Sequence, residues 1–194
     1  MTSQDEADFA NFNFETEVSA RYHDYRRGTL ERYVSLIRLT SLLGSIVAFI
    51  AVSIFVEGDA RNTLIIELAT ILIGTVNLFD LVFGVDARAR RHEQLYQRFK
   101  ELQIKMLRKQ TEWAKYLPEW QIEAKGIHVD EPATYWAVYN SAWNQMIERY
   151  RLDESNKRVV SRWQKLTKNI RHYNPEDFKP VSLARASSTA LNAH

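Results

Sequence analysis

The stretch that decides the fold is LTSLLGSIVAFIAVSIFV, residues 39–56, which runs for 18 residues without a charged side chain. As an α-helix it would be about 27 Å long, close to the thickness of the hydrocarbon core of a bilayer. Apolar side chains occupy every side of such a helix, so it has no face suited to water. Tyr33 precedes it, where an interfacial aromatic side chain is favoured. The sequence therefore predicts a transmembrane helix over about residues 36–56.

The next apolar stretch, residues 63–85, reads TLIIELATILIGTVNLFDLVFGV and contains Glu67 and Asp80. On its own this stretch is ambiguous between a membrane span and a buried helix, because its uncharged centre is short. Only six residues, EGDARN, separate it from the first stretch, which favours a tight helical hairpin. A hairpin buried in a soluble protein is the alternative, but the chain offers little other apolar surface to cover it. We expect an all-α integral membrane protein with a two-helix transmembrane hairpin.

The overall composition excludes several classes of protein. The 194 residues carry 26 Lys and Arg against 24 Asp and Glu, a net charge of +2 that gives no case for binding nucleic acid. Because there is no cysteine, disulfide scaffolds, Cys-ligated metal centres and thiol nucleophiles are excluded. There is no phosphate-binding loop, HExxH or GxSxG motif, and we interpret His23, His92 and His172 as surface or packing residues. We expect no catalytic residue, metal, cofactor or enzyme activity.

Arginine and lysine side chains flank both predicted spans, whereas the connecting loop carries only Arg61. The positive-inside rule then places both termini in the cytoplasm. Just after the second span lie Arg88, Arg90, Arg91 and His92. We interpret this cluster as a topology determinant that contacts anionic lipid. A phosphate-binding site for a nucleotide signal is the alternative.

One stripe of the second span is polar or small. Glu67, Thr70, Gly74 and Asn77 follow spacings of 3, 4 and 3, which place them on one face of a helix. A polar stripe against lipid would be costly, so it should face water or a neighbouring helix. In one interpretation these residues line a pore, where a ring of Glu67 carboxylates favours cations. In the other they form ordinary contacts between spans.

Two further features concern how the hairpin closes. A symmetric hairpin places position 80 opposite position 39, so Asp80 should form an ion pair with Arg38 at the cytoplasmic interface. The alternative is that each side chain reaches separately to the lipid headgroups. In the first span, small residues suited to close helix contact form a stripe of Ser41, Gly44, Ala48 and Ala51.

The segments outside the membrane are predicted to be mostly helical. Residues 1–14 are expected to form a disordered tail, although the three phenylalanines there also fit an aromatic docking peptide. Residues 15–117 comprise the hairpin with its flanking cytoplasmic helices. Residues 118–174 form C-terminal cytoplasmic helices, and residues 175–194 form a second disordered tail.

After the second span, residues 86–117 are predicted to form one long helix with a heptad-like apolar seam. The seam consists of Leu95, Phe99, Leu102, Met106 and Trp113. It would pack either against the chain's own helices or against another subunit. Pro118 then breaks the helical pattern, and two helices are expected over residues 133–151 and 154–173.

The run VNLFDLVFGVDARARRHEQLYQRFKEL, residues 76–102, resembles the end of the second span and the following helix of SLATT domains. The residues that carry the resemblance are Asn77, Leu78, Ala89, Arg90, His92, Leu95 and Phe99. SLATT domains are two-span effector domains of bacterial conflict systems. The resemblance implies a pore-forming effector in the bacterial inner membrane, opened by an upstream sensor protein or a nucleotide second messenger. Permeabilising the membrane would stop the infected cell, which is antiphage defence by abortive infection.

Because one chain supplies only two spans, a pore requires a homo-oligomer of about four copies or more. The expected partners are therefore the lipid bilayer and further copies of the chain. Two other functions stay open. One is a non-conducting membrane anchor or scaffold that recruits a cytoplasmic partner through its C-terminal helices. The other is a sensor of a small ligand without a pore.

Overall fold

The computed structural model describes the backbone of residues 3–54 and 60–182. The side chains outside the description within these ranges are those of residues 51–54, 60–63, 65, 79 and 80. In the described ranges the chain is all-helical and has no strand, only an isolated β-bridge between Arg158 and Pro180. The predicted fold class is confirmed to this extent.

The chain divides into two compact units, which we name the hairpin unit (residues 27–91) and the helical unit (residues 1–26 and 92–194). The α-helices are α1 (Ser3–Ile54), α2 (Ala60–Phe83), α3 (Val85–Arg108), α4 (Trp113–Val129), α5 (Trp136–Arg149) and α6 (Arg162–Thr167). Short 3-10 turns lie at Gln110–Glu112, Glu154–Asn156 and Pro175–Asp177.

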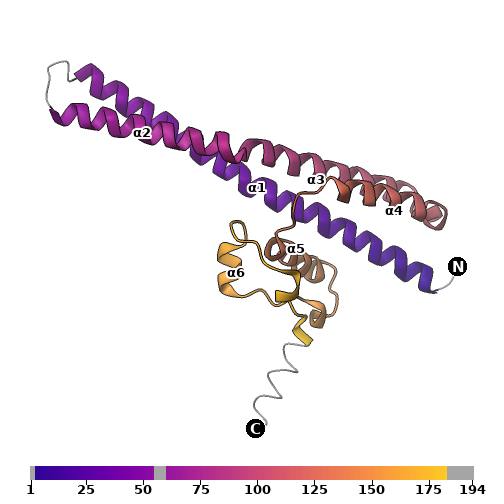
Figure 1. The fold of residues 1–194 in the computed structure, drawn as a ribbon. Helices are drawn as coiled ribbons and strands as arrows, with labels where there is room; N and C mark the ends of the chain where they lie inside the picture. Colours follow the sequence, from indigo (N-terminus) through magenta and orange to yellow (C-terminus); the bar gives the residue numbers. More distant parts are fainter. Residues whose placement is uncertain (1–2, 55–59, 183–194) are drawn as a thin grey trace, which may run out of the picture. The chain divides into compact units, whose positions relative to one another are not determined.

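In the hairpin unit, α2 lies beside the C-terminal part of α1, as Figure 1 shows. The two helices approach closely at Gly44, where an added Cβ would lie only 2.7 Å from Cγ1 of Ile73. Gly44 belongs to the predicted stripe of small residues, so the absence of a side chain permits this contact. At the other end of α2, Gly84 has a φ of 55°, which side chains rarely tolerate. Helix α2 therefore ends at Phe83, slightly before the predicted end of the span.

Two helices of the described chain are long and apolar enough to cross a membrane. Their apolar segments lie in α1 and at Ile66–Phe83, and only 11% and 0% of these segments are buried. The core helix of a soluble protein would be mostly buried instead. Large apolar side chains such as Leu43 and Leu81 therefore remain exposed on the hairpin unit.

The core of the helical unit is built around the predicted apolar seam, which lies on α3 except for Trp113 at the start of α4. Its members Leu95, Phe99, Leu102, Met106 and Trp113 are all buried, with exposed fractions of 0 to 9%. They pack with residues of α1 and α4, namely Ala20, Trp120, Ala124 and Ile127. The seam was predicted to pack either against the chain's own helices or against another subunit. In the structure it packs against the chain's own helices.

The N-terminal residues, expected as a disordered tail, belong to α1 from Ser3 onward. The ring of Phe9 stacks on Trp113 with centroids 5.0 Å apart. Phe14 meets the edge of Trp143 in α5 at 4.9 Å. Burial of these aromatic rings stabilises a helical segment whose polar sequence would not hold it alone.

The helices of the C-terminal half differ from the prediction in their bounds. The long helix expected over residues 86–117 ends at Arg108, and a 3-10 turn separates it from α4. Helix α4 runs through Pro118, which was expected to break the pattern. The loss of one backbone hydrogen bond there is offset because Trp113 and Trp120, on either side, are buried in the core.

Beyond α5, the helix expected over residues 154–173 is interrupted, and its helical parts are the 3-10 turn at Glu154–Asn156 and the short α6. Ser161 caps α6 through a reciprocal capping box with Gln164. Residues 175–182 of the expected tail are ordered, since Phe178 is only 4% exposed. Residues 183–194 lie outside the described residues.

Candidate functional site

The polar stripe of α2 is exposed in the hairpin unit. Glu67, Thr70 and Gly74 are exposed, and a Cβ added at Gly74 would meet no atom within 4 Å. Asn77 is exposed as well, and its Oδ1 accepts a hydrogen bond of 3.0 Å from the hydroxyl of Ser41 in α1. All four residues are therefore accessible, and Asn77 also joins the two helices.

At the end of the hairpin, Arg38 lies beside Asp86, with 3.5 Å between Nη2 and Oδ1. Arg90 donates to the other carboxylate oxygen of Asp86 at 2.5 Å. Both arginines are well exposed, so each ion pair contributes at most about 1 kcal/mol. The predicted pair of Arg38 with Asp80 stays a prediction, because the side chain of Asp80 lies outside those that the structure describes.

The predicted cluster after the second span contains two kinds of residue. Arg88, Arg90 and Arg91 are exposed in the hairpin unit, as a lipid or phosphate contact requires. His92 is only 4% exposed and belongs to the interior of the helical unit. We therefore correct the assignment of His92: its side chain is enclosed by the protein and does not lie on the surface.

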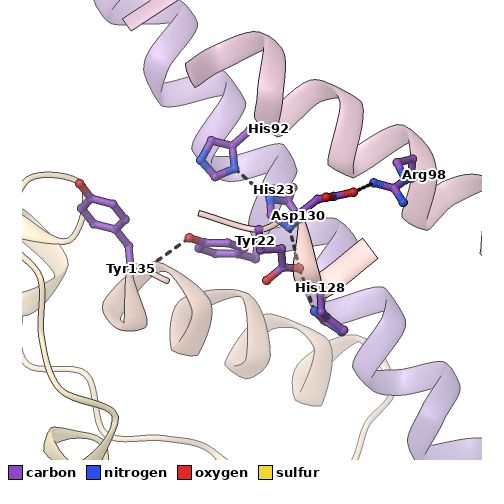
Figure 2. A network of polar contacts seen from close by, with 8 residues as sticks. Tyr22, His23, His92, Arg98, His128, Asp130 and Tyr135 are labelled. Atoms are coloured by element: carbon purple, nitrogen blue, oxygen red, sulfur yellow. Dashed lines mark hydrogen bonds and ion pairs between the residues drawn. The ribbon is translucent and has the colours of Figure 1, made fainter. Parts of the chain in front are cut away.

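Within the helical unit, His92 belongs to a chain of polar side chains (Figure 2). Its Nδ1 lies 2.8 Å from Nδ1 of His23, which comes from α1. The other ring nitrogen of His23, Nε2, lies 3.1 Å from Oε1 of Glu131 in the loop after α4. The same carboxylate oxygen lies 2.9 Å from Nδ1 of His128 at the end of α4. The chain thus runs from a fully buried imidazole pair to the partly exposed His128.

Neighbouring side chains hold this chain in place. The ring of Phe99 stacks nearly parallel to His23, with centroids 5.7 Å apart. The hydroxyl of Tyr22 accepts a hydrogen bond of 3.1 Å from the backbone N–H of Tyr135, as Figure 2 shows. An ion pair of Arg98 with Asp130 fastens the loop that carries Glu131 to α3. Because α1, α3 and the loop all contribute, the chain of polar contacts joins three parts of the helical unit.

The electrostatics of the chain centre on Glu131. Burial alone would raise the pKa of this carboxyl group, but the hydrogen bonds from His128 and His23 outweigh burial and lower the pKa to about 2. The same hydrogen bond raises the pKa of His128, although partial burial opposes the change. Glu131 is therefore a permanent negative charge at neutral pH, and it favours the protonated form of His128.

The geometry also fixes where hydrogen atoms can sit. Because a carboxylate only accepts, Nε2 of His23 must carry a hydrogen that it donates to Glu131. The contact between the Nδ1 atoms of His23 and His92 needs one donor and one acceptor. One of the two Nδ1 atoms therefore carries a hydrogen, and the other presents its lone pair.

Sequence reasoning missed this chain, since its members are far apart in the sequence. His23 is separated by 69 residues from His92 and by 108 residues from Glu131. The interpretation of the histidines as packing residues describes their burial but not their partners. The only local signal was the spacing of three between His128 and Glu131, which is common on helix ends.

The donor set does not point to metal chemistry. Among the residues that the structure describes, no group of three or more His, Cys, Asp or Glu side chains could hold a metal ion.

No family model, curated protein or solved structure matches this chain. The function is therefore argued from the two sites themselves, the exposed stripe of α2 and the buried chain of polar contacts.

Proposed function

We propose that this chain is a membrane-spanning, pore-forming effector whose copies assemble around the polar stripe of α2. The observation that carries the proposal is that Glu67, Thr70 and Gly74 are exposed within the apolar segment Ile66–Phe83, of whose described side chains only Ala69 is buried. Lipid cannot solvate the carboxylate of Glu67, whereas the hydroxyl of Thr70 already donates to the carbonyl of Ile66 at 2.8 Å. An oligomer that turns the stripe inward, toward water and other copies, leaves only apolar side chains for the lipid.

The contacts within one hairpin are compatible with this arrangement. Ile73 and Asn77 use one side of α2 to meet α1. Gly74 and Glu67 are turned by about 100° and about 120° from Ile73, whereas Thr70 is turned by about 60° and borders that contact. Leu72 is turned by about 160° from Gly74 and is exposed on a third side. One side thus serves the hairpin, one serves the neighbouring copies, and one serves the lipid.

In this proposal both termini are cytoplasmic and the membrane is the inner membrane of a bacterium. The cations that flank the hairpin support the orientation. The resemblance of residues 76–102 to SLATT domains supports a role in antiphage defence, in which a sensor protein or nucleotide messenger opens the pore. The helical unit would receive that signal, and the infected cell would stop growing.

The test is leakage of a small dye from vesicles that contain the purified chain. We expect leakage from the wild type and less leakage from Gly74→Leu, because the new side chain fills open space on the stripe. Glu67→Ala should lower the preference for cations, since a carboxylate ring is lost. Leu72→Ala is the matched control, because it changes the same helix on the side proposed to face lipid, and its leakage should equal that of the wild type.

Chemical cross-linking in the same vesicles separates the pore from an anchor. Oligomers are expected for the wild type. A chain that remains monomeric in the bilayer and releases no dye contradicts the pore and favours a non-conducting anchor. A chain that stays in the supernatant without detergent contradicts any membrane function.

A further inference from the structure

A surface of the helical unit outside both sites combines exposed apolar side chains with cations. The segment from Lys157 to Tyr173 contains six Lys and Arg residues and no Asp or Glu. On and just after α6, Trp163, Leu166 and Ile170 are 60%, 74% and 74% exposed. Their spacings of 3 and 4 place them on one face of a helical turn. We name this face, with its flanking cations, the basic apolar surface.

The segment is fixed to the protein by its opposite side. Nη1 of Arg26 donates hydrogen bonds to the carbonyl and the side-chain oxygen of Asn169, at 3.1 and 3.2 Å. The ring of His172 packs on Tyr135 with centroids 3.9 Å apart. Backbone N–H groups of Ile170 and the next residue bond to a carbonyl of α6 and continue its turn. The apolar side chains are thus presented outward by a segment that is held in place.

Most of the positive charge of this surface is not neutralised by the residues that the structure describes. Lys157 pairs with Glu148 and Glu154 at the edge of the segment. Arg162, Lys165, Lys168 and Arg171 form no ion pair with any residue that the structure describes. Burial and the nearby Lys165 both lower the pKa of Lys168, as expected where cations lack an anionic partner.

We propose that the basic apolar surface binds a bilayer that contains anionic lipid, with Trp163, Leu166 and Ile170 inserted among the headgroups. Tryptophan and aliphatic side chains favour the membrane interface, and cations beside them favour anionic headgroups. A protein partner would need an acidic groove to match this surface. The chain's own residues 181–194 could not neutralise the cations, because they contain no acidic side chain. The surface adds a peripheral lipid contact to the helical unit, and it does not depend on whether the hairpin conducts.

The absence of cysteine in the chain permits a clean test with single labelled cysteines. Leu166→Cys carries an environment-sensitive fluorophore on the basic apolar surface. Ile122→Cys is the matched control, because Ile122 is an equally exposed residue of α4, at 71%. Each full chain is reconstituted into vesicles of phosphatidylcholine alone and into vesicles that also contain phosphatidylglycerol. A blue shift of the label at position 166 is expected only with phosphatidylglycerol, and no shift is expected at position 122.

Charge variants test the role of the cations. Each Lys or Arg near an anionic surface contributes enough to change an equilibrium about fivefold. Arg162→Gln with Lys165→Gln should therefore lower the ratio of bound to unbound surface about 25-fold. High salt should act in the same direction. The control, Arg108→Gln with Lys125→Gln, removes equal charge from other parts of the helical unit and should leave the shift unchanged.

Three outcomes would overturn the proposal. If the labels at positions 166 and 122 show equal emission wavelengths in all vesicles, the surface stays in water. Equal shifts with and without phosphatidylglycerol would mean that another part of the chain or a second copy covers it. A shift on addition of single-stranded RNA, with none from phosphatidylglycerol, would assign the surface to nucleic acid. None of these outcomes depends on dye leakage, so they are separable from a failure of the pore.

Discussion

Glu131→Gln is the substitution that most directly tests the buried chain of polar contacts. The change removes the negative charge but keeps the shape of the side chain. In the wild type, Oε1 of Glu131 lies 3.1 Å from Nε2 of His23 and 2.9 Å from Nδ1 of His128. A neutral amide still offers an oxygen, but its hydrogen bonds to the two rings are no longer assisted by a negative charge. The stability of the helical unit should therefore fall, and the loss should depend on pH.

The magnitude follows from the pKa of the carboxyl group. Its pKa is lowered from 4.5 to about 2, and one pKa unit corresponds to about 1.4 kcal/mol, so the charged form of Glu131 contributes about 3 kcal/mol to folding. Since the folded pKa lies below the unfolded one, this contribution is complete above pH 4.5 and is lost as the pH falls toward 2. The variant should thus be about 3 kcal/mol less stable at pH 7, and this difference should vanish near pH 2.

The assay is unfolding by urea in mild detergent, followed by tryptophan fluorescence. All five tryptophans belong to the helical unit, so the signal reports that unit and not the hairpin. Glu119→Gln, which neutralises an exposed carboxylate of α4, is the control and should change the stability by less than about 0.5 kcal/mol.

Two results would refute the reasoning about Glu131. Equal stability of the variant and the wild type at pH 7 would mean that the hydrogen bonds to the carboxylate contribute nothing. A loss of the same size at pH 7 and near pH 2 would mean that the substitution acts through packing and not through charge.

The remaining predictions concern the packing of each unit. Gly44→Val should destabilise the hairpin by about 1–3 kcal/mol, because its side chain would collide with Ile73. Gly28→Ala should stabilise α1 slightly, because the added methyl group meets no atom within 4 Å. Thermal unfolding followed by circular dichroism compares these two variants, and equal midpoints would contradict the close approach of α1 and α2. Phe9→Ala should cost about 2 kcal/mol in the urea assay and shift the emission of Trp113 to the red, since the stacked ring is lost. An unchanged emission would mean that the N-terminal residues do not pack on the core.

Much of the fold was readable from local patterns. The hairpin stretches are apolar over lengths that fit two helices, and the seam from Leu95 to Met106 has the spacing of a helix with one buried side. These signals depend on neighbours in the sequence, so they survive without knowledge of the tertiary structure. Helix bounds were less accurate where long-range burial outweighed a local preference, as at Pro118 inside α4.

The candidate sites divide in the same way. The polar stripe of α2 could be found from the sequence, because Glu67, Thr70 and Gly74 repeat at helical spacing within one apolar stretch. The hydrogen bond of Asn77 could not be found from the sequence, since it depends on the position of Ser41 on the other helix of the hairpin.

The amino-acid sequence by itself determined that the chain is helical, that two of its segments lack a face for water, and that polar residues mark one side of the second segment. The tertiary structure alone decided which partners the buried polar groups have. His23, His92 and Glu131 meet because folding brings α1, α3 and a distant loop together. A hydrogen bond extends over only about 3 Å, so no pattern of neighbouring residues can specify it across a hundred positions.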